Sequence, residues 1–303
     1  MDLSVVIPTL NGRAALPATL GAIAEHLSEA EVIVANGPSA DGTSGFVCEH
    51  PVVNTLLELS ERNPNVARNA GLAKADGDAI AFLDPGTAVE STWIGAIETA
   101  LTAGTDAVTG PVHREFDGDV TTESLEEARV GSRTVRFFDG GNVVFSREAI
   151  EALDGFDEHL EMGAARDVAH RLAGQDRTLR WEPTAAVLRT ATDVARQNGS
   201  AHRRHALHYR SQGYRVAKNY GLGWKTTVQL VGKLARDGYA ETKSVAVGDG
   251  KPSRWFGNGR DAITQVARGA TEGLTARLTD RTPSRNPNGL SARQDRPVSR
   301  CET

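Results

Sequence analysis

The chain has 303 residues, of which 39% are hydrophobic and 24% are charged. These values are ordinary for a soluble globular protein, and the length allows one large α/β domain with an appendage or two modest domains. No apolar run reaches the ~18 residues of a membrane-spanning helix. The opening Met1-Asp2-Leu3 has no basic segment, and two cysteines, Cys48 and Cys301, are too few for a disulfide framework. We therefore expect a protein of the reducing cytoplasm, without a signal peptide.

The net charge of −5 hides an asymmetry along the chain. Residues 1–200 carry 15 Lys and Arg against 31 Asp and Glu, whereas residues 201–303 carry 19 against 8. A basic C-terminal third indicates an anionic partner such as a phosphorylated lipid, a membrane surface or a diphosphate. The alternative is that this third packs on the acidic body of the same chain. No nucleic-acid partner is expected.

The elements expected in the first part of the chain alternate between strands and helices. Short apolar runs predict the strands, and apolar residues at helical spacing predict the helices between them. The strands are expected at 3–7, 31–35, 52–59, 79–83 and 106–112, and the helices at 13–27, 65–75 and 90–102. This order predicts an α/β fold with a mostly parallel sheet covered on both faces.

The later part of the chain changes character twice. A glycine turn over 139–145 enters a strand, helices are expected at 147–153 and 166–173, and 178–183 is extended. Basic helices follow at 200–220 and 224–238, with a further helix at 259–279, and a Pro-, Ser-, Asn- and Arg-rich end is expected to be disordered. We expect a nucleotide-binding domain over 1–195, a basic helical region over 196–280 and a loose tail over 281–303.

Three polar loops follow expected parallel strands: residues 8–11, 36–43 and 84–86. Ligands of open parallel sheets bind beyond the carboxyl ends of the strands, so these loops are expected to share one rim. Four segments in this order resemble family 2 glycosyltransferases, which have the GT-A fold. They are Ser4–Asn11, Val34–Thr43, Asn65–Asp84 and Asp139–Asn142 with Gly155–Asp157, and the resemblance covers about residues 1–190.

The resemblance implies a nucleotide sugar as donor, transfer with inversion, and a divalent Mg²⁺ or Mn²⁺ ion on the diphosphate. By matching positions, it assigns donor binding to eight residues: Pro8, Thr9, Asn11, Asn36, Asp41, Arg68, Asn69 and Asp84. It assigns acceptor binding to Gly140, Gly141 and Asn142. Members of the family also use a carboxylate to take the proton of the attacking hydroxyl.

The sequence departs from the family at its acidic positions. Asn36 stands where an Asp normally meets the nucleobase, Gly86 replaces the second Asp of the metal motif, and Ala164-Ala165 replace the Glu-Asp pair that holds the base. Asp167, Glu161 and Asp157 are the candidate substitutes for the base. His202 is a candidate metal ligand beside Asp84, and Arg166 with the C-terminal cations could hold the diphosphate.

Two interpretations of these losses stay open. The first is an active inverting transferase with relocated chemistry, and the second is a non-catalytic sugar-nucleotide-binding partner of another transferase. For the first, the basic amphipathic third favours a lipid-phosphate-linked glycan as acceptor at the cytoplasmic face of the membrane. The acidic, lysine-poor body is similar to proteins of salt-loving archaea, whose family members build N-glycans of surface-layer proteins on dolichol phosphate.

Overall fold

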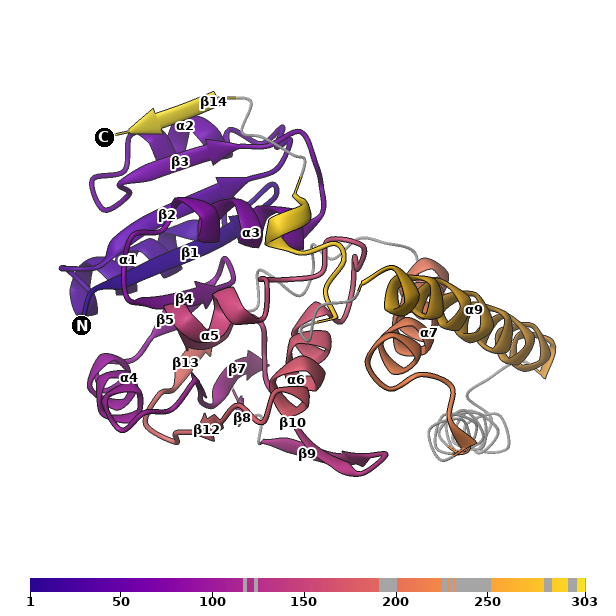
Figure 1. The fold of residues 1–303 in the computed structure, drawn as a ribbon. Helices are drawn as coiled ribbons and strands as arrows, with labels where there is room; N and C mark the ends of the chain where they lie inside the picture. Colours follow the sequence, from indigo (N-terminus) through magenta and orange to yellow (C-terminus); the bar gives the residue numbers. More distant parts are fainter. Residues whose placement is uncertain are drawn as a thin grey trace. The chain divides into compact units, whose positions relative to one another are not determined.

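The computed structural model describes residues 1–116, 119–122, 125–190, 201–224, 228, 232, 252–280, 285–293 and 299–302. The chain divides into two compact units (Figure 1). Unit 1 comprises Met1–Glu127, Arg136–Asn198 and Asn288–Thr303, and unit 2 comprises Ala128–Val135 and Gly199–Pro287. The expected boundary near 195 therefore lies close to a unit boundary, but each unit takes segments from two or more parts of the chain.

Unit 1 is built on an eight-stranded sheet of order β12-β6-β11-β4-β1-β2-β3-β14. Its central strands β4, β1, β2 and β3 are parallel, β11 is antiparallel to both of its neighbours, and β14 closes the edge antiparallel to β3. The strands are β1 (Leu3–Thr9), β2 (Glu31–Asn36), β3 (Thr55–Glu58), β4 (Ala79–Leu83), β6 (Ala107–Thr109), β11 (Asn142–Ser146), β12 (Leu179–Trp181) and β14 (Ser299–Glu302).

The remaining strands form a four-stranded sheet of order β5-β13-β7-β8 and a hairpin of β9 and β10. They are β5 (Thr87–Val89), β7 (Val112–Phe116), β8 (Asp119–Thr122), β9 (Glu126–Val130), β10 (Arg133–Phe137) and β13 (Val187–Arg189). The helices of unit 1 are α1 (Leu16–His26), α2 (Thr43–Cys48), α3 (Pro64–Lys74), α4 (Trp93–Thr102), α5 (Arg147–Ala152) and α6 (Ala164–Gly174), with a 3₁₀ turn at Leu290–Ala292.

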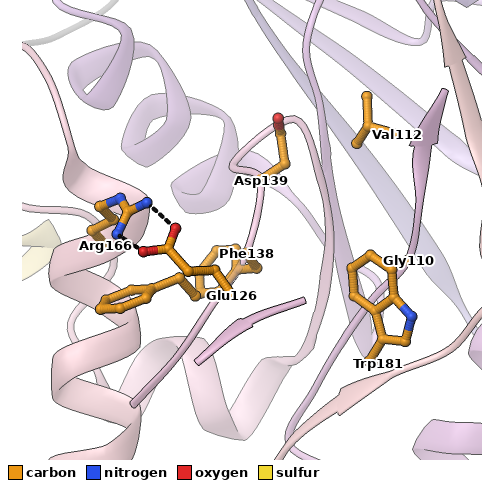
Figure 2. Close-up of a pocket in the computed structure, with 8 residues that line it drawn as sticks. Gly110, Val112, Glu126, Phe138, Asp139, Arg166 and Trp181 are labelled. Atoms are coloured by element: carbon orange, nitrogen blue, oxygen red, sulfur yellow. Dashed lines mark hydrogen bonds and ion pairs between the residues drawn. The ribbon is translucent and has the colours of Figure 1, made fainter. Parts of the chain in front are cut away.

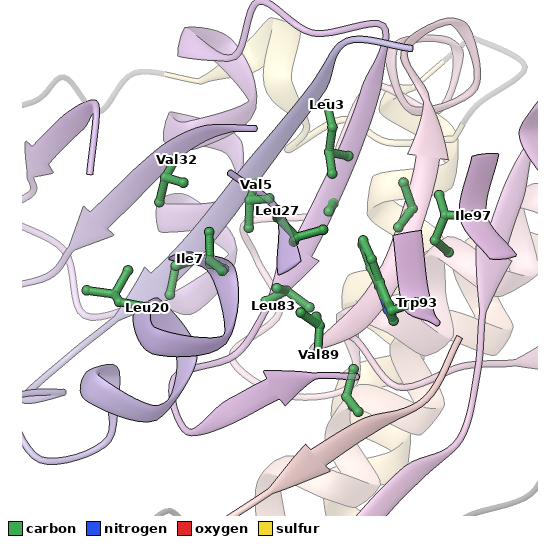
Figure 3. Close-up of a cluster of buried hydrophobic side chains, with 14 of the residues drawn as sticks. Leu3, Val5, Ile7, Leu20, Leu27, Val32, Leu83, Val89, Trp93 and Ile97 are labelled. Atoms are coloured by element: carbon green, nitrogen blue, oxygen red, sulfur yellow. The ribbon is translucent and has the colours of Figure 1, made fainter. Parts of the chain in front are cut away.

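The central strands are continuous apolar runs whose residues are buried on both sides, which explains why helices cover both faces of the sheet. Figure 3 shows one face, where Val5 and Ile7 of β1 pack with Leu20 of α1 and Trp93 of α4. On the other face α3 lies so close to β1 that a Cβ on Gly71 would fall 2.3 Å from Val6. The α/β fold with a mostly parallel, helix-covered sheet is thus confirmed.

Three local features differ from the sequence expectation. The single strand expected at 106–112 is two strands in two different sheets, because Gly110 and Pro111 interrupt it. The expected loose tail contributes β14, which pairs with the open edge of β3. Cys48, the last residue of α2, is disulfide-bonded, a link that two cysteines did not lead us to expect.

Unit 2 contains two long helices, α7 (Ala201–Tyr220) and α9 (Pro252–Thr279). Glycines allow their backbones to approach: a Cβ on Gly269 would meet the carbonyl oxygen of Arg210 at 1.9 Å. Arg210 also donates two hydrogen bonds of 2.8 Å to Glu272. No helix among the described residues is long and apolar enough to cross a membrane. The helix expected at 224–238 falls largely outside the described residues.

Candidate functional site

The first two loops of the expected rim start side by side, because β1 and β2 are parallel and Thr9 is in register with Asn36. The hydroxyl oxygen of Thr9 is buried and has no hydrogen-bond partner among the described residues. A Cβ on Gly12 would lie 2.1 Å from this oxygen, so the next loop leaves just enough room for it. The hydroxyl of Thr9 is therefore a polar group at the rim that a ligand can satisfy.

The side chain of Asn36 holds the second loop together. It is buried; its Oδ1 accepts a hydrogen bond of 2.6 Å from Ser39, and its Nδ2 donates one of 3.0 Å to Ser44. Asn11 and Asp41 act similarly: Asn11 accepts a bond from the backbone of Ala40, and Asp41 accepts one from the backbone of Arg13. These three residues shape the rim, so their side-chain groups meet protein partners in this structure.

The third loop is a tight turn of the sequence Asp84-Pro-Gly-Thr87. The amide of Thr87 donates to the carbonyl oxygen of Asp84 at 3.1 Å, and Gly86 has a φ of +83°. Pro at the second and Gly at the third position are the signature of a type II turn. Position 86 is therefore a backbone requirement of this loop, since a residue with a side chain is strained at that φ.

Arg68 and Arg189 converge on the carboxylate of Asp84. Arg68 donates from Nη2 to Oδ1 at 2.9 Å, and Nη2 of Arg189 lies 3.9 Å from Oδ2. Arg189 also donates two hydrogen bonds, of 3.0 and 2.9 Å, to Asp139. The burial of Asp139 alone would raise its pKa, but the bonds and charge of Arg189 hold the pKa below its usual value. Two carboxylates and two guanidinium groups thus form one charged cluster at the rim.

Gly140 and Gly141 let this cluster close. A Cβ on Gly141 would lie 2.4 Å from Cγ of Asp84, and a Cβ on Gly140 would lie 3.2 Å from Cβ of Ala165. The glycine pair therefore presses the 139–142 turn against Asp84 and against the start of α6. The two glycines sit at the predicted place on the rim, and the structure gives them a packing role there.

A cavity of about 210 Å³ opens beside Asp139 (Figure 2). Glu126 and Arg166 form an ion pair on one side of it, and the guanidinium of Arg166 stacks over the ring of Phe137 at 4.5 Å. The half-buried Trp181 lies on the other side. An aromatic face opposite paired charges is the arrangement that suits a polyhydroxylated ligand, which offers both C–H surface and hydroxyls.

The three carboxylates expected to supply a base lie elsewhere. Asp167 is fully buried and accepts a hydrogen bond of 2.8 Å from Nε of Arg171. Asp157 is also buried and accepts bonds from the amide of His159 and the side chain of Asn288. Glu161 is exposed, and none of the three lines the cavity. Asp167 and Asp157 act in this structure as anchors of the 153–160 segment.

Residues 4–154 match the family described as Glycosyl transferase family 2. The chain belongs to glycosyltransferase family 2. Among curated family relatives, a pre-mycofactocin glycosyltransferase of Mycobacterium tuberculosis is 28% identical over an alignment of 201 residues that covers 61% of this chain and 42% of that protein. Glycosyltransferase AglE of Haloferax volcanii is 25% identical over 182 residues, covering 53% of this chain and 58% of that protein. The chain thus spans about two fifths of the first relative and somewhat more than half of the second.

Solved structures of similar fold extend over more of the chain. Mannosyltransferase PcManGT from Pyrobaculum calidifontis, solved with GDP-Man and Mn²⁺, has a TM-score of 0.57 at 17% identity and covers 90% of this chain and 87% of its own. TarS 1–349 of S. aureus, solved with UDP-GlcNAc, has a TM-score of 0.62 at 16% identity and covers 96% and 89%. At these identities the likeness establishes the GT-A type of fold.

The metal site of family 2 does not fit the residues found here. Both oxygens of Asp84 face guanidinium groups, and position 86 offers no carboxylate. No group of three His, Cys, Asp or Glu side chains able to hold a metal occurs in the part of the chain that the structure describes. The side chain of His202 lies outside the described residues. A divalent ion could take further oxygen ligands from a diphosphate and from water, but the carboxylate of Asp84 is already bonded to Arg68 and faces Arg189.

Two other residues that were predicted to bind donor or acceptor are bonded to other parts of the protein. Asn69 is buried, and its amide exchanges hydrogen bonds of 2.8 Å with the backbone of Phe156. Asn142 is buried, accepts a bond from the indole of Trp93 and donates to the carbonyl of Ala185. Of the predicted Arg68–Asn69 pair, Arg68 alone joins the charged cluster. Pro8 remains a prediction.

Arg189, Glu126 and the carboxylate of Asp139 were not among the site residues predicted from the sequence. Arg189 reaches Asp84 because β13 pairs with β5 in a register that sets Arg189 opposite Thr87. This contact joins positions far apart in the chain, and no local sequence motif predicts it. The only local signal was that an arginine ends the apolar run of β13.

Proposed function

We propose that this chain is a glycosyltransferase that binds a nucleotide sugar at the rim formed by β1, β2 and β4. The family match over residues 4–154 carries the proposal. The rim adds the unsatisfied hydroxyl of Thr9 and the cationic groups of Arg68 and Arg189, which suit an anionic diphosphate. PcManGT with GDP-Man and TarS with UDP-GlcNAc support a nucleotide-linked sugar as the donor class.

A thermal-shift screen of nucleotide sugars tests this proposal. A ligand that binds only the folded state raises the unfolding temperature, and at 100 times its Kd it adds about 2.7 kcal/mol of stability. We expect at least one UDP- or GDP-linked sugar to raise the midpoint, and the matching nucleoside monophosphate to raise it less. If no nucleotide sugar shifts the midpoint at millimolar concentration, the proposal is wrong.

The acceptor is proposed to bind in the cavity between Trp181 and the Glu126–Arg166 pair. This position is next to Asp139 and hence to the charged cluster around Asp84. The basic C-terminal third supports a lipid-phosphate-linked glycan as acceptor, and its assembly for N-glycosylation or cell-surface glycans is part of the proposal. Dolichol phosphate as carrier and surface-layer proteins as final targets are part of this proposal.

Glu126 is the base that the geometry favours for an inverting transfer. It lines the cavity, its carboxylate is exposed, and Arg166 fixes its orientation. The acceptor hydroxyl would give its proton to Glu126 as its oxygen bonds to the anomeric carbon and the nucleoside diphosphate leaves. Glu126→Gln should lower kcat about 10²-fold with little change in donor binding, whereas Glu161→Gln, also exposed but outside the cavity, should retain activity. An equal loss of kcat in both variants would show that Glu126 is not the base.

Peripheral membrane contact is proposed for unit 2. Trp224 is 83% exposed, Leu222 two residues before it is also exposed, and Arg203 and Arg204 are exposed on α7. Aromatic and basic side chains together favour the interface of an anionic bilayer. The protein should sediment with phosphatidylglycerol vesicles at low salt, less at high salt, and less with Trp224→Ser. Equal sedimentation with neutral phosphatidylcholine vesicles, or none with either, would contradict this contact.

A non-catalytic sugar-nucleotide-binding partner is the second candidate. The observation that favours it is the pair Ala164 and Ala165 at the start of α6, where the family carries its base. A binding partner would give the thermal shifts expected above but no donor hydrolysis or transfer. Product analysis with the stabilising donor and a lipid-phosphate acceptor therefore separates the two candidates.

A further inference from the structure

In the charged cluster at the rim, guanidinium groups face the carboxylate oxygens that a metal ion would need as ligands. Oδ1 of Asp84 accepts a bond from Arg68, and Arg189 lies between the carboxylates of Asp84 and Asp139. The side chains of Arg68 and Arg189 are 12% and 11% exposed. Both guanidinium groups are therefore largely shielded from water. They lie at the rim beside the carboxylate of Asp84, whose side chain is 31% exposed.

The backbone fixes Arg189 in this position. The end of β13 is bonded to the turn after β4: the amide of Thr190 donates to the carbonyl oxygen of Gly86 at 3.1 Å. Arg189 itself is opposite Thr87 in the β5–β13 register. The same type II turn that removes a carboxylate from position 86 thus brings a guanidinium to Asp84.

We propose that Arg68 and Arg189 hold the donor diphosphate in place of a divalent metal ion, so that this chain binds its nucleotide donor without metal. The inference rests on the proposed function, because it names how the same rim recognises its ligand. Two guanidinium groups carry the charge of one divalent ion, and phosphate oxygens can take the place of the carboxylate and amide oxygens that their planar forks bond in this structure. Arg114, whose Nη2 lies 3.9 Å from Asp139, adds a further positive charge.

One unsatisfied group supports a ligand at this place. Nε of Arg68 is buried and has no hydrogen-bond partner among the described residues, while Nη1 and Nη2 are bonded to Asn65 and Asp84. A buried N–H group of a charged side chain is costly to leave unpaired. The positive charge held there also stabilises a leaving diphosphate as its charge develops.

Calorimetric titration with UDP and with GDP tests the inference on the full chain. One arm contains EDTA and the others contain Mn²⁺ or Mg²⁺. We expect at least one of the two nucleotides to bind in EDTA with a Kd within about threefold of the value in metal. Binding that requires Mn²⁺ or Mg²⁺ would overturn the inference and leave the proposed function standing. Absence of binding in every arm would overturn both.

Variants of Arg189 identify the group responsible. Arg189→Gln should weaken nucleotide binding in EDTA about tenfold or more. Arg189→Lys keeps the charge but loses the planar fork, so its affinity should lie between those of Arg189→Gln and the wild type. In Arg189→Gln the freed carboxylates of Asp84 and Asp139 should make added Mn²⁺ strengthen binding. Arg180→Gln, an exposed arginine paired with Glu182, is the control and should bind as the wild type does. Unchanged binding in both Arg189 variants would overturn the proposal.

Discussion

Replacing Arg68 with glutamine is expected to lower kcat/KM for transfer about 10²-fold. The substitution removes the guanidinium group whose positive charge faces Asp84 at 2.9 Å. Loss of one preorganised group that stabilises developing charge typically costs 10²- to 10³-fold. The measurement is steady-state transfer with the donor that gives the largest thermal shift.

Arg147→Gln is the matched control for this variant. Arg147 is also largely buried, but it donates to the backbone carbonyls of Ala75 and Gly77, away from the rim. Its loss should lower the unfolding temperature and leave kcat/KM near the wild-type value. If Arg147→Gln loses as much activity as Arg68→Gln, the effect of Arg68 is on folding rather than on the donor.

The fold could be predicted because its signals are local. The apolar runs of β1, β2 and β4 and the helical spacing between them determine an α/β order, whatever the rest of the chain does. β14 was not predicted because Ser299–Glu302, three polar residues and Cys301, form a strand only by pairing with the open edge of β3. Strand formation at an edge depends on the neighbour, and a single sequence does not display that neighbour.

The site was predicted at the rim beyond the carboxyl ends of the parallel strands, and the structure brings part of the predicted set together there. Asp84 and Arg68 lie together there, since parallel strands send their following loops to one rim. The sequence interpretation sought substitutes for the lost acids in Asp157 and Asp167, which are near the lost positions along the chain. The structure surrounds those two carboxylates with partners and supplies Arg189 and Glu126 from distant segments. Proximity along the chain was a poor guide because the site is assembled by sheet register.

The glycine at position 141 offers a second test with a large expected effect. An alanine there places a Cβ 2.4 Å from Cγ and 2.5 Å from Oδ2 of Asp84, distances at which the carboxylate must move. Moving it separates Asp84 from both guanidinium groups, and overpacking of this kind costs about 1–3 kcal/mol. We expect Gly141→Ala to weaken UDP or GDP binding about 10- to 100-fold in calorimetric titration.

Gly95→Ala separates this steric effect from a general effect of losing a glycine. Gly95 lies within α4, and a Cβ there has no atom within 4 Å, so alanine should stabilise the helix by about 0.5–1 kcal/mol and leave nucleotide binding unchanged. Weaker nucleotide binding in Gly141→Ala, with unchanged binding in Gly95→Ala, would show that the close contact of Gly141 with Asp84 is what binding needs. Wild-type affinity in Gly141→Ala would show instead that the nucleotide tolerates a displaced Asp84, and the role of its carboxylate at the rim would have to be withdrawn.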